Sequence, residues 1–209
     1  MKLTERFEDY FYLNKTKIQL HLPFDIVLRS FELLKDDSFQ DYEKLEILIE
    51  MFVMNDIEHF TVEEKVKVWE TILINFINDG EEAEENENEI KIFDIEQDAK
   101  YIYSSFLSDY KIDLFEVQGK LHWKKFKALL SGLNDESKLN QVIGYRTMEI
   151  PKMDEHNAKE RARIIKLKEV YALKLDEKEL KKQTEIKVKE LDNKLNSVAN
   201  LFKKGGKRN

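Results

Sequence analysis

Apolar side chains recur every three or four residues through most of the chain, and this spacing predicts helices over most of its length. Acidic and hydroxyl residues stand where helices would begin, and Thr61 with Glu64 forms a capping-box pattern. Pro23 suits the first turn of the first helix. The predicted helices run from Pro23 to Leu34, Lys44 to Met54, Thr61 to Ile77, Ala99 to Tyr110, Leu121 to Ser131, and from Asp135 or Ser137 toward Pro151.

The segment from Asp9 to Leu22 follows a different pattern. It contains two short runs rich in β-branched and aromatic residues, separated by Asn14 and Lys15. Such an arrangement is typical of two strands joined by a tight turn. We therefore predict a small β-hairpin at this point.

The C-terminal part of the chain can be helical from His156 to Phe202 with little interruption. Its last apolar residues follow a spacing of three and four, which predicts a coiled-coil-like seam of about two heptads. This seam is one candidate face for a protein partner, formed by Val188, Leu191, Leu195, Val198 and Phe202. The expected fold is mainly α: a helical bundle with a small N-terminal β-hairpin and a long C-terminal helix.

Composition supports this fold and indicates the cellular compartment. Glycine (6) and proline (2) are scarce, as expected for long helices with few turns, and cysteine is absent, so disulfides and thiolate metal sites are excluded. The first residues lack the apolar run of a secretory signal, and no apolar run is long enough for a transmembrane helix. We expect a protein of the cytoplasm, without membrane contact.

Charge is unevenly distributed along the chain. Residues 157–209 contain 16 Lys and Arg against 8 Asp and Glu, whereas the rest contains 19 against 34. Residues 79–89 hold seven carboxylates and no basic residue, which indicates an acidic linker. We therefore divide the chain into an N-terminal hairpin with helices (1–78), this linker (79–91), a helical block (92–155) and a basic extended helix (156–209).

Motifs of catalysis and cofactor binding are missing from the sequence. It contains no phosphate-binding glycine loop, no HExxH and no GxSxG, and its four histidines lie far apart. We expect no enzyme, no cofactor and no metal site. The basic C-terminal helix could contact phosphates, but its eight carboxylates lie between the lysines at helical spacing. We therefore favour an exposed helix with a protein partner, and expect no nucleic-acid partner.

Three sequence strings between residues 93 and 173 carry a family resemblance: DLFE, GKLHWxKFxALLxGL and QVIxYRTMxIPK. They resemble the bacteriophage gp-fifteen family of Gram-positive phages, and the hairpin, helices and acidic linker before them are similar in layout. The motif positions fall on Gly119, Leu121, His122, Trp123, Phe126, Leu129, Leu130, Gly132, Gln141, Tyr145 and Arg146.

The resemblance implies a tail assembly chaperone of siphophages, acting in the host cytoplasm and absent from the mature virion. Its implied partners are the tape measure protein, tail tube subunits and a neighbouring tail assembly chaperone; a homo-oligomer stays open. Besides the C-terminal seam, the candidate partner-binding residues are Trp123, Phe126, Leu130, Tyr145 and Arg146. A structural tail-completion or connector component of the virion is the first alternative, and a nucleic-acid-binding regulator that uses the basic helix is the second.

Overall fold

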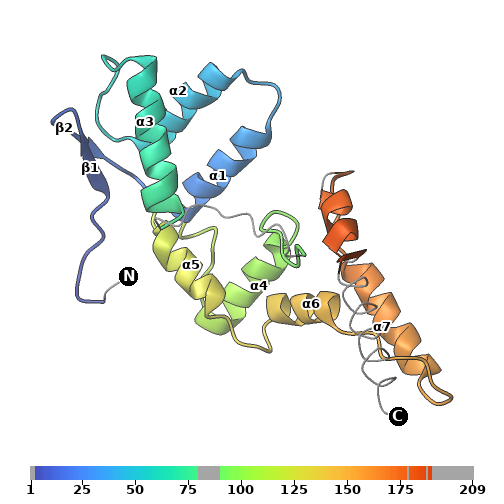
Figure 1. Cartoon of the computed structure of the whole chain (residues 1–209). Coiled ribbons are helices and arrows are strands. Elements are labelled where there is room, and N and C mark those ends of the chain that lie inside the picture. Colours follow the sequence, from blue (N-terminus) through green and yellow to red (C-terminus); the bar gives the residue numbers. More distant parts are fainter. Residues whose placement is uncertain (1–2, 80–89, 178, 187, 190–209) are drawn as a thin grey trace, which may run out of the picture. The chain divides into compact units, whose positions relative to one another are not determined.

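The computed structural model describes residues 3–79, 90–177, 179–186 and 188–189, and is mainly α-helical with one β-hairpin, as predicted (Figure 1). The chain forms two compact units that are not consecutive in sequence. Unit 1 comprises Met1–Ala83 and Tyr103–Asn134, and unit 2 comprises Glu84–Ile102 and Asp135–Asn209. The predicted block 92–155 thus contributes to both units.

Unit 1 begins with the predicted hairpin, in which β1 (Tyr10–Leu13) pairs antiparallel with β2 (Thr16–Gln19). The two turn residues, Asn14 and Lys15, both have positive φ angles, of 48° and 68°. This is the backbone of a two-residue turn whose twist matches that of the strands, and asparagine tolerates it well. The hairpin lies beside α3 (Figure 1), where the Asn14 amide donates to Glu64 at 2.7 Å.

The helices of unit 1 are α1 (Phe24–Lys35), α2 (Asp41–Phe52), α3 (Val62–Thr71) and α5 (Trp123–Ser131). The capping box of α3 is confirmed, because Glu64 N–H donates to the Thr61 hydroxyl and Thr61 N–H donates to the Glu64 carboxylate. After Thr71 the helix continues as a π-helix, η1 (Ile72–Ile77), which the apolar spacing did not reveal.

A stack of aromatic rings forms the centre of unit 1. Phe126 lies between Phe24 and Phe106, with ring centroids 4.8 and 5.3 Å away. The chain segment before α1 is tied to the start of α5 by two backbone hydrogen bonds, from Phe24 N–H to Leu121 and from Trp123 N–H to Leu22. These bonds align α1 and α5, so that their aromatic side chains meet in the core.

Unit 2 contains α6 (Lys138–Thr147) and α7 (Ala158–Tyr171), which pack against each other. The first turn of α4 (Ala99–Tyr110) also belongs to this unit, and the rest of α4 belongs to unit 1. Ser137 begins α6 by accepting a hydrogen bond from Asn140 N–H, one of the two starts predicted. The apolar contacts of α6 and α7 come from Leu139, Val142 and Ile164, all buried.

The helix predicted from residue 156 is interrupted. It ends at Tyr171, residues 172–176 are not helical, and helical structure returns over residues 179–186. The interruption is held by Gln97, whose side-chain amide donates to Lys174 C=O at 2.9 Å and accepts from Lys174 N–H at 2.8 Å. Because Gln97 is distant in sequence, local helical periodicity could not predict the break. In the part of the chain that the structure describes, no helix has the length and apolarity to cross a membrane.

Candidate functional site

The candidate binding residues on α5 lie largely inside unit 1. Trp123 and Phe126 keep only 6% and 1% of their surface exposed, and Leu130 is half-buried. Their burial gives Trp123 and Phe126 a packing role, and contact of these side chains with a partner stays a prediction. Packing in this core accounts for the two large buried side chains of α5, Trp123 and Phe126.

Side chains of α5 also bind the C-terminal end of η1. The Trp123 indole N–H and the Lys127 ammonium both donate to Ile77 C=O, at 3.0 and 2.8 Å. Asp79, two residues further on, forms ion pairs with Lys124 and Lys127. Burial raises the pKa of Asp79, but hydrogen bonds from Lys127 and Lys124 outweigh it and hold the pKa below its ordinary value. The first acidic residue of the predicted linker is therefore fixed to α5.

Arg146, one of the motif residues of α6, is the centre of a buried polar network in unit 2. Its guanidinium donates to both oxygens of the Asp98 carboxylate at 2.7 Å, and the carboxylate is completely buried. Two further donors reach Tyr171 C=O at 2.6 Å and Ile92 C=O at 3.0 Å. The planar guanidinium of arginine suits this arrangement, because one side chain can donate to a carboxylate and to two backbone carbonyl groups at the same time. Arg146 thus joins α6, the end of α7 and the segment before α4.

Tyr145 packs next to this network and not on an open face. Its ring lies 5.1 Å from that of Tyr171, which in turn lies 6.2 Å from Tyr101. Tyr145 is half-buried. Tyr145 and Arg146 therefore both contact Tyr171 at the end of α7.

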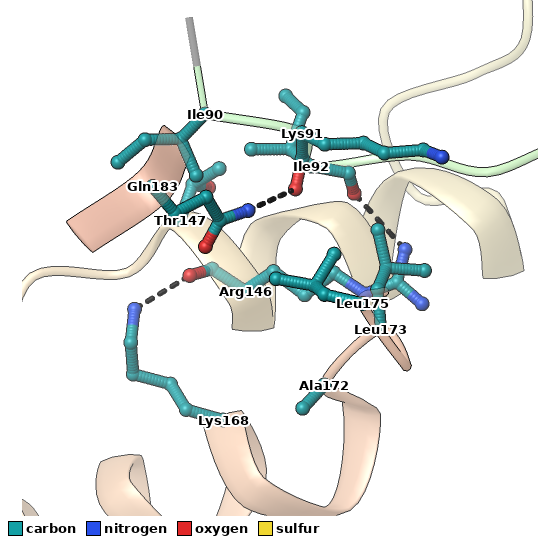
Figure 2. A pocket seen from close by; sticks show the side chains of 10 residues that line it. All are labelled: Ile90, Lys91, Ile92, Arg146, Thr147, Lys168, Ala172, Leu173, Leu175 and Gln183. Carbon is teal, nitrogen blue, oxygen red and sulfur yellow. Dashed lines mark hydrogen bonds between the residues drawn. The ribbon is translucent and has the colours of Figure 1, made fainter. Parts of the chain in front are cut away.

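A pocket of about 450 Å³ opens beside Arg146 within unit 2 (Figure 2). Its apolar walls come from the segment before α4 and from the non-helical segment after α7. Polar side chains of α6, α7 and the following helical residues complete it. The lining residues are Ile90, Lys91, Ile92, Arg146, Thr147, Lys168, Ala172, Leu173, Leu175 and Gln183.

The polar groups around the pocket are engaged with the protein itself. Lys168 donates to Arg146 C=O at 2.6 Å, and Gln183 donates weakly to Lys91 C=O at 3.4 Å (Figure 2). Lys168 also donates to Met148 C=O at 2.6 Å. A ligand that enters the pocket can therefore bury apolar surface without displacing these bonds. The arrangement suits an aliphatic or aromatic side chain of a partner, because an apolar group there leaves no polar atom without its hydrogen bond.

Lys91 links the pocket to the helical residues beyond it. Its ammonium lies 2.9 Å from both the Asp94 and the Glu179 carboxylates. Burial lowers the pKa of Lys91, but the hydrogen bonds with Asp94 and Glu179 raise it above its ordinary value. For Asp94, burial raises the pKa, while the Gln97 N–H and Lys91 outweigh it and lower the pKa. Both groups are therefore charged at neutral pH.

The lowered pKa of Asp94 predicts a pH dependence of stability. A carboxyl whose pKa is lower in the folded state stabilises the fold above its unfolded pKa, and this contribution is lost as the pH falls through the folded value. We expect the free energy of unfolding, measured in urea, to fall as the pH is lowered below about 4. In Asp94→Asn this fall should be smaller, by about 0.5–1 kcal/mol.

Glu155→Gln, which changes an exposed carboxylate in the loop before α7, serves as the control and should leave the acid profile as in the natural protein. Identical profiles for Asp94→Asn and the natural chain would contradict the prediction. The measurement is urea unfolding followed by circular dichroism between pH 3 and 7.

The C-terminal seam is only partly described. Val188 is 55% exposed. Leu191, Leu195, Val198 and Phe202 lie outside the described residues. No group of three or more His, Asp or Glu side chains within the described ranges is placed to hold a metal ion.

Sequence reasoning missed the pocket and most of its lining. Asp98 and Ile92 are not among the predicted site residues, and Leu173 and Leu175 fall within the long C-terminal helix that the sequence predicts. The one signal present was the arginine of the α6 motif. A single arginine among apolar helix positions indicates a buried carboxylate partner, although it does not say which one.

The fold is mainly α-helical, and unit 2 contains a pocket with apolar walls. The family model described as Bacteriophage Gp15 protein matches residues 3–173, so the chain belongs to this family and the predicted resemblance is confirmed. It is a bacteriophage protein of phage structure or morphogenesis. The comparisons with curated proteins and with solved structures gave no match.

Proposed function

We propose that this protein is a tail assembly chaperone. It binds the tape measure protein and tail tube subunits, with a neighbouring tail assembly chaperone, in the host cytoplasm during siphophage tail morphogenesis. Membership of the Gp15 family supports a role in phage morphogenesis. The observation that carries the proposal is the preformed pocket of unit 2, with its apolar walls and internally bonded polar groups.

A long helical partner presents apolar side chains that must be covered until the tail is built. A pocket of about 450 Å³ takes one or two such side chains, and its walls are formed by Ile90, Ile92, Leu173 and Leu175. Ile92 is still 40% exposed, so part of the wall is available to a partner. Binding of a helix by a few anchor side chains is reversible, as a chaperone requires.

The proposal is tested by co-expressing the full chain with fragments of the tape measure protein encoded by the same phage. We expect at least one fragment to become soluble and to co-purify with the chain. Fragments that stay insoluble throughout would contradict the proposal. Stoichiometric recovery of the chain from purified virions would contradict it as well, because a chaperone leaves the finished particle.

The pocket makes a specific prediction for Ile92→Gln. This change places an amide in the apolar wall and leaves intact the backbone carbonyl that binds Arg146. We expect the Kd for a captured tape measure fragment to rise about fivefold to tenfold, because the burial of an isoleucine side chain by the partner is lost. Isothermal titration calorimetry with the purified fragment measures this change.

Ile150→Gln is the matched control. Ile150 lies in the same unit, is exposed to a similar extent at 43%, and does not line the pocket. Its Kd should stay within about twofold of the natural value. Equal effects of the two substitutions would show that the pocket is not where the partner binds.

A further inference from the structure

The outer edge of β1 is an open sheet edge. In an antiparallel pair, residues alternate between those bonded to the opposite strand and those whose N–H and C=O point away from it. Leu20 N–H donates to Asp9 C=O at 2.7 Å, so residues 9, 11 and 13 face β2. The backbone groups of Tyr10 and Tyr12 therefore point outward, and within the described residues they meet no other segment.

The opposite edge of the hairpin is covered at its C-terminal end, around Gln19 and Leu20. Gln19 C=O accepts from Met54 N–H at 2.8 Å, and Gln19 N–H donates to the Asn55 side chain at 2.8 Å. Leu20 also forms an antiparallel bridge with Val53. The β2 edge is thus bonded at Gln19 and Leu20, whereas no such contact is found at Tyr10 and Tyr12 of β1 within the described residues, so the two edges are unequal.

β1 lacks the features that protect edge strands from pairing. Its sequence, YFYL, contains no proline and no charge, and its register has no bulge. Tyr12 is 65% exposed, and Tyr10 lies next to it on the outer face, with ring centroids 6.0 Å apart. An extended segment could add to this edge with four backbone hydrogen bonds and stack on the two tyrosines.

We propose that this edge pairs with β1 of a second copy of the chain. In an antiparallel pair centred on Phe11, Tyr10 of each copy bonds with Tyr12 of the other, so every outward N–H and C=O of β1 is satisfied. The four tyrosine side chains then lie together on the outer face, as cross-strand aromatic pairs prefer.

Charge around the strand favours a second copy as the occupant. Glu8 precedes β1 and Lys15 follows it, so the strand has an acidic end and a basic end; the carboxylate of Asp9, which lies between Glu8 and β1, is bonded to His122. Antiparallel pairing places Glu8 of one copy opposite the turn that carries Lys15 of the other. Both side chains are exposed and can adjust to each other. A second copy that paired in parallel would place the acidic ends of the two strands side by side, so the parallel arrangement lacks this charge complementarity.

Sedimentation equilibrium of the full chain tests the pairing. The weight-average mass should rise with concentration from that of one chain toward that of two. Tyr12→Pro should weaken the association about tenfold or more, since it removes an outward N–H in each copy but no bond within the hairpin. Tyr12→Val keeps this N–H and should weaken it less. A chain that stays monomeric at all concentrations would overturn the proposal.

Exchange of charge identifies the partner as a second copy in this register. Lys15→Glu alone and Glu8→Lys alone should each weaken self-association, because like charges then meet in the pair. An equimolar mixture of the two variants should restore it, since each brings the charge that the other lacks. Thermal melting of each variant checks that it is folded. A dimer unchanged in Tyr12→Pro, or no recovery in the mixture, would overturn the proposal.

Discussion

Replacing Arg146 with methionine is expected to lower the unfolding free energy by about 3–5 kcal/mol. The change leaves the Asp98 carboxylate, which is fully buried, with its charge uncompensated. It also removes the donors to Tyr171 C=O and Ile92 C=O. The cost is therefore that of a buried charge without its counter-ion, added to two unmade hydrogen bonds. Urea unfolding followed by circular dichroism measures it.

Hydrogen exchange should locate the damage in unit 2. Peptides from α6 and α7 should lose protection, whereas those from α2 and α3 should lose much less, because the Arg146 network lies wholly in unit 2. Arg146→Lys keeps the positive charge but loses the planar guanidinium. Its unfolding free energy should therefore lie between those of the natural protein and Arg146→Met.

Arg163→Met is the control for this substitution. Arg163 also faces a carboxylate, that of Glu160, but at 3.6 Å and with its side chain 71% exposed. An exposed pair of this kind contributes little, so the loss should stay below about 0.5 kcal/mol. If both substitutions cost the same, the Arg146–Asp98 pair does not hold unit 2 together.

Most of the helices and the hairpin could be predicted from the sequence, because their signals are local. The Thr61–Glu64 capping box and the Asn14–Lys15 turn involve neighbours in the chain, and both are found as predicted. The π-helix η1 and the break after Tyr171 were not predicted. Both are accompanied by distant side chains: Trp123 and Lys127 bind the end of η1, and Gln97 holds Lys174.

The division into two units also depends on contacts between residues that are distant in the chain, so local sequence patterns did not predict it. Sequence reasoning joined neighbouring helices into consecutive segments, whereas residues 103–134 belong with residues 1–83. The cause is the aromatic core, in which Phe126 of α5 packs on Phe24 of α1. The candidate site shares this dependence, since the pocket beside Arg146 is made of segments that are far apart in the chain. Of its lining residues, only Arg146 and Thr147 belong to one of the three motif strings.

Phe126→Ala is expected to cost about 3–5 kcal/mol of unfolding free energy. Phe126 is 1% exposed and its ring lies between those of Phe24 and Phe106, so the change leaves a cavity where α1, α4 and α5 meet. The Trp123 ring is 5.7 Å away and should report the loss as a shift of its fluorescence to longer wavelength. Urea unfolding gives the free energy.

Phe115→Ala provides the comparison, because Phe115 belongs to the same unit but is 70% exposed, and its ring contacts that of Tyr103 at 5.3 Å. Its loss should stay below about 1 kcal/mol. The pair also bears on function: a partner-binding defect in Phe126→Ala with no loss of stability would mean that this side chain contacts the partner directly. A defect that appears only together with unfolding would assign Phe126 to the core, and would direct the search for the contact surface to the pocket of unit 2.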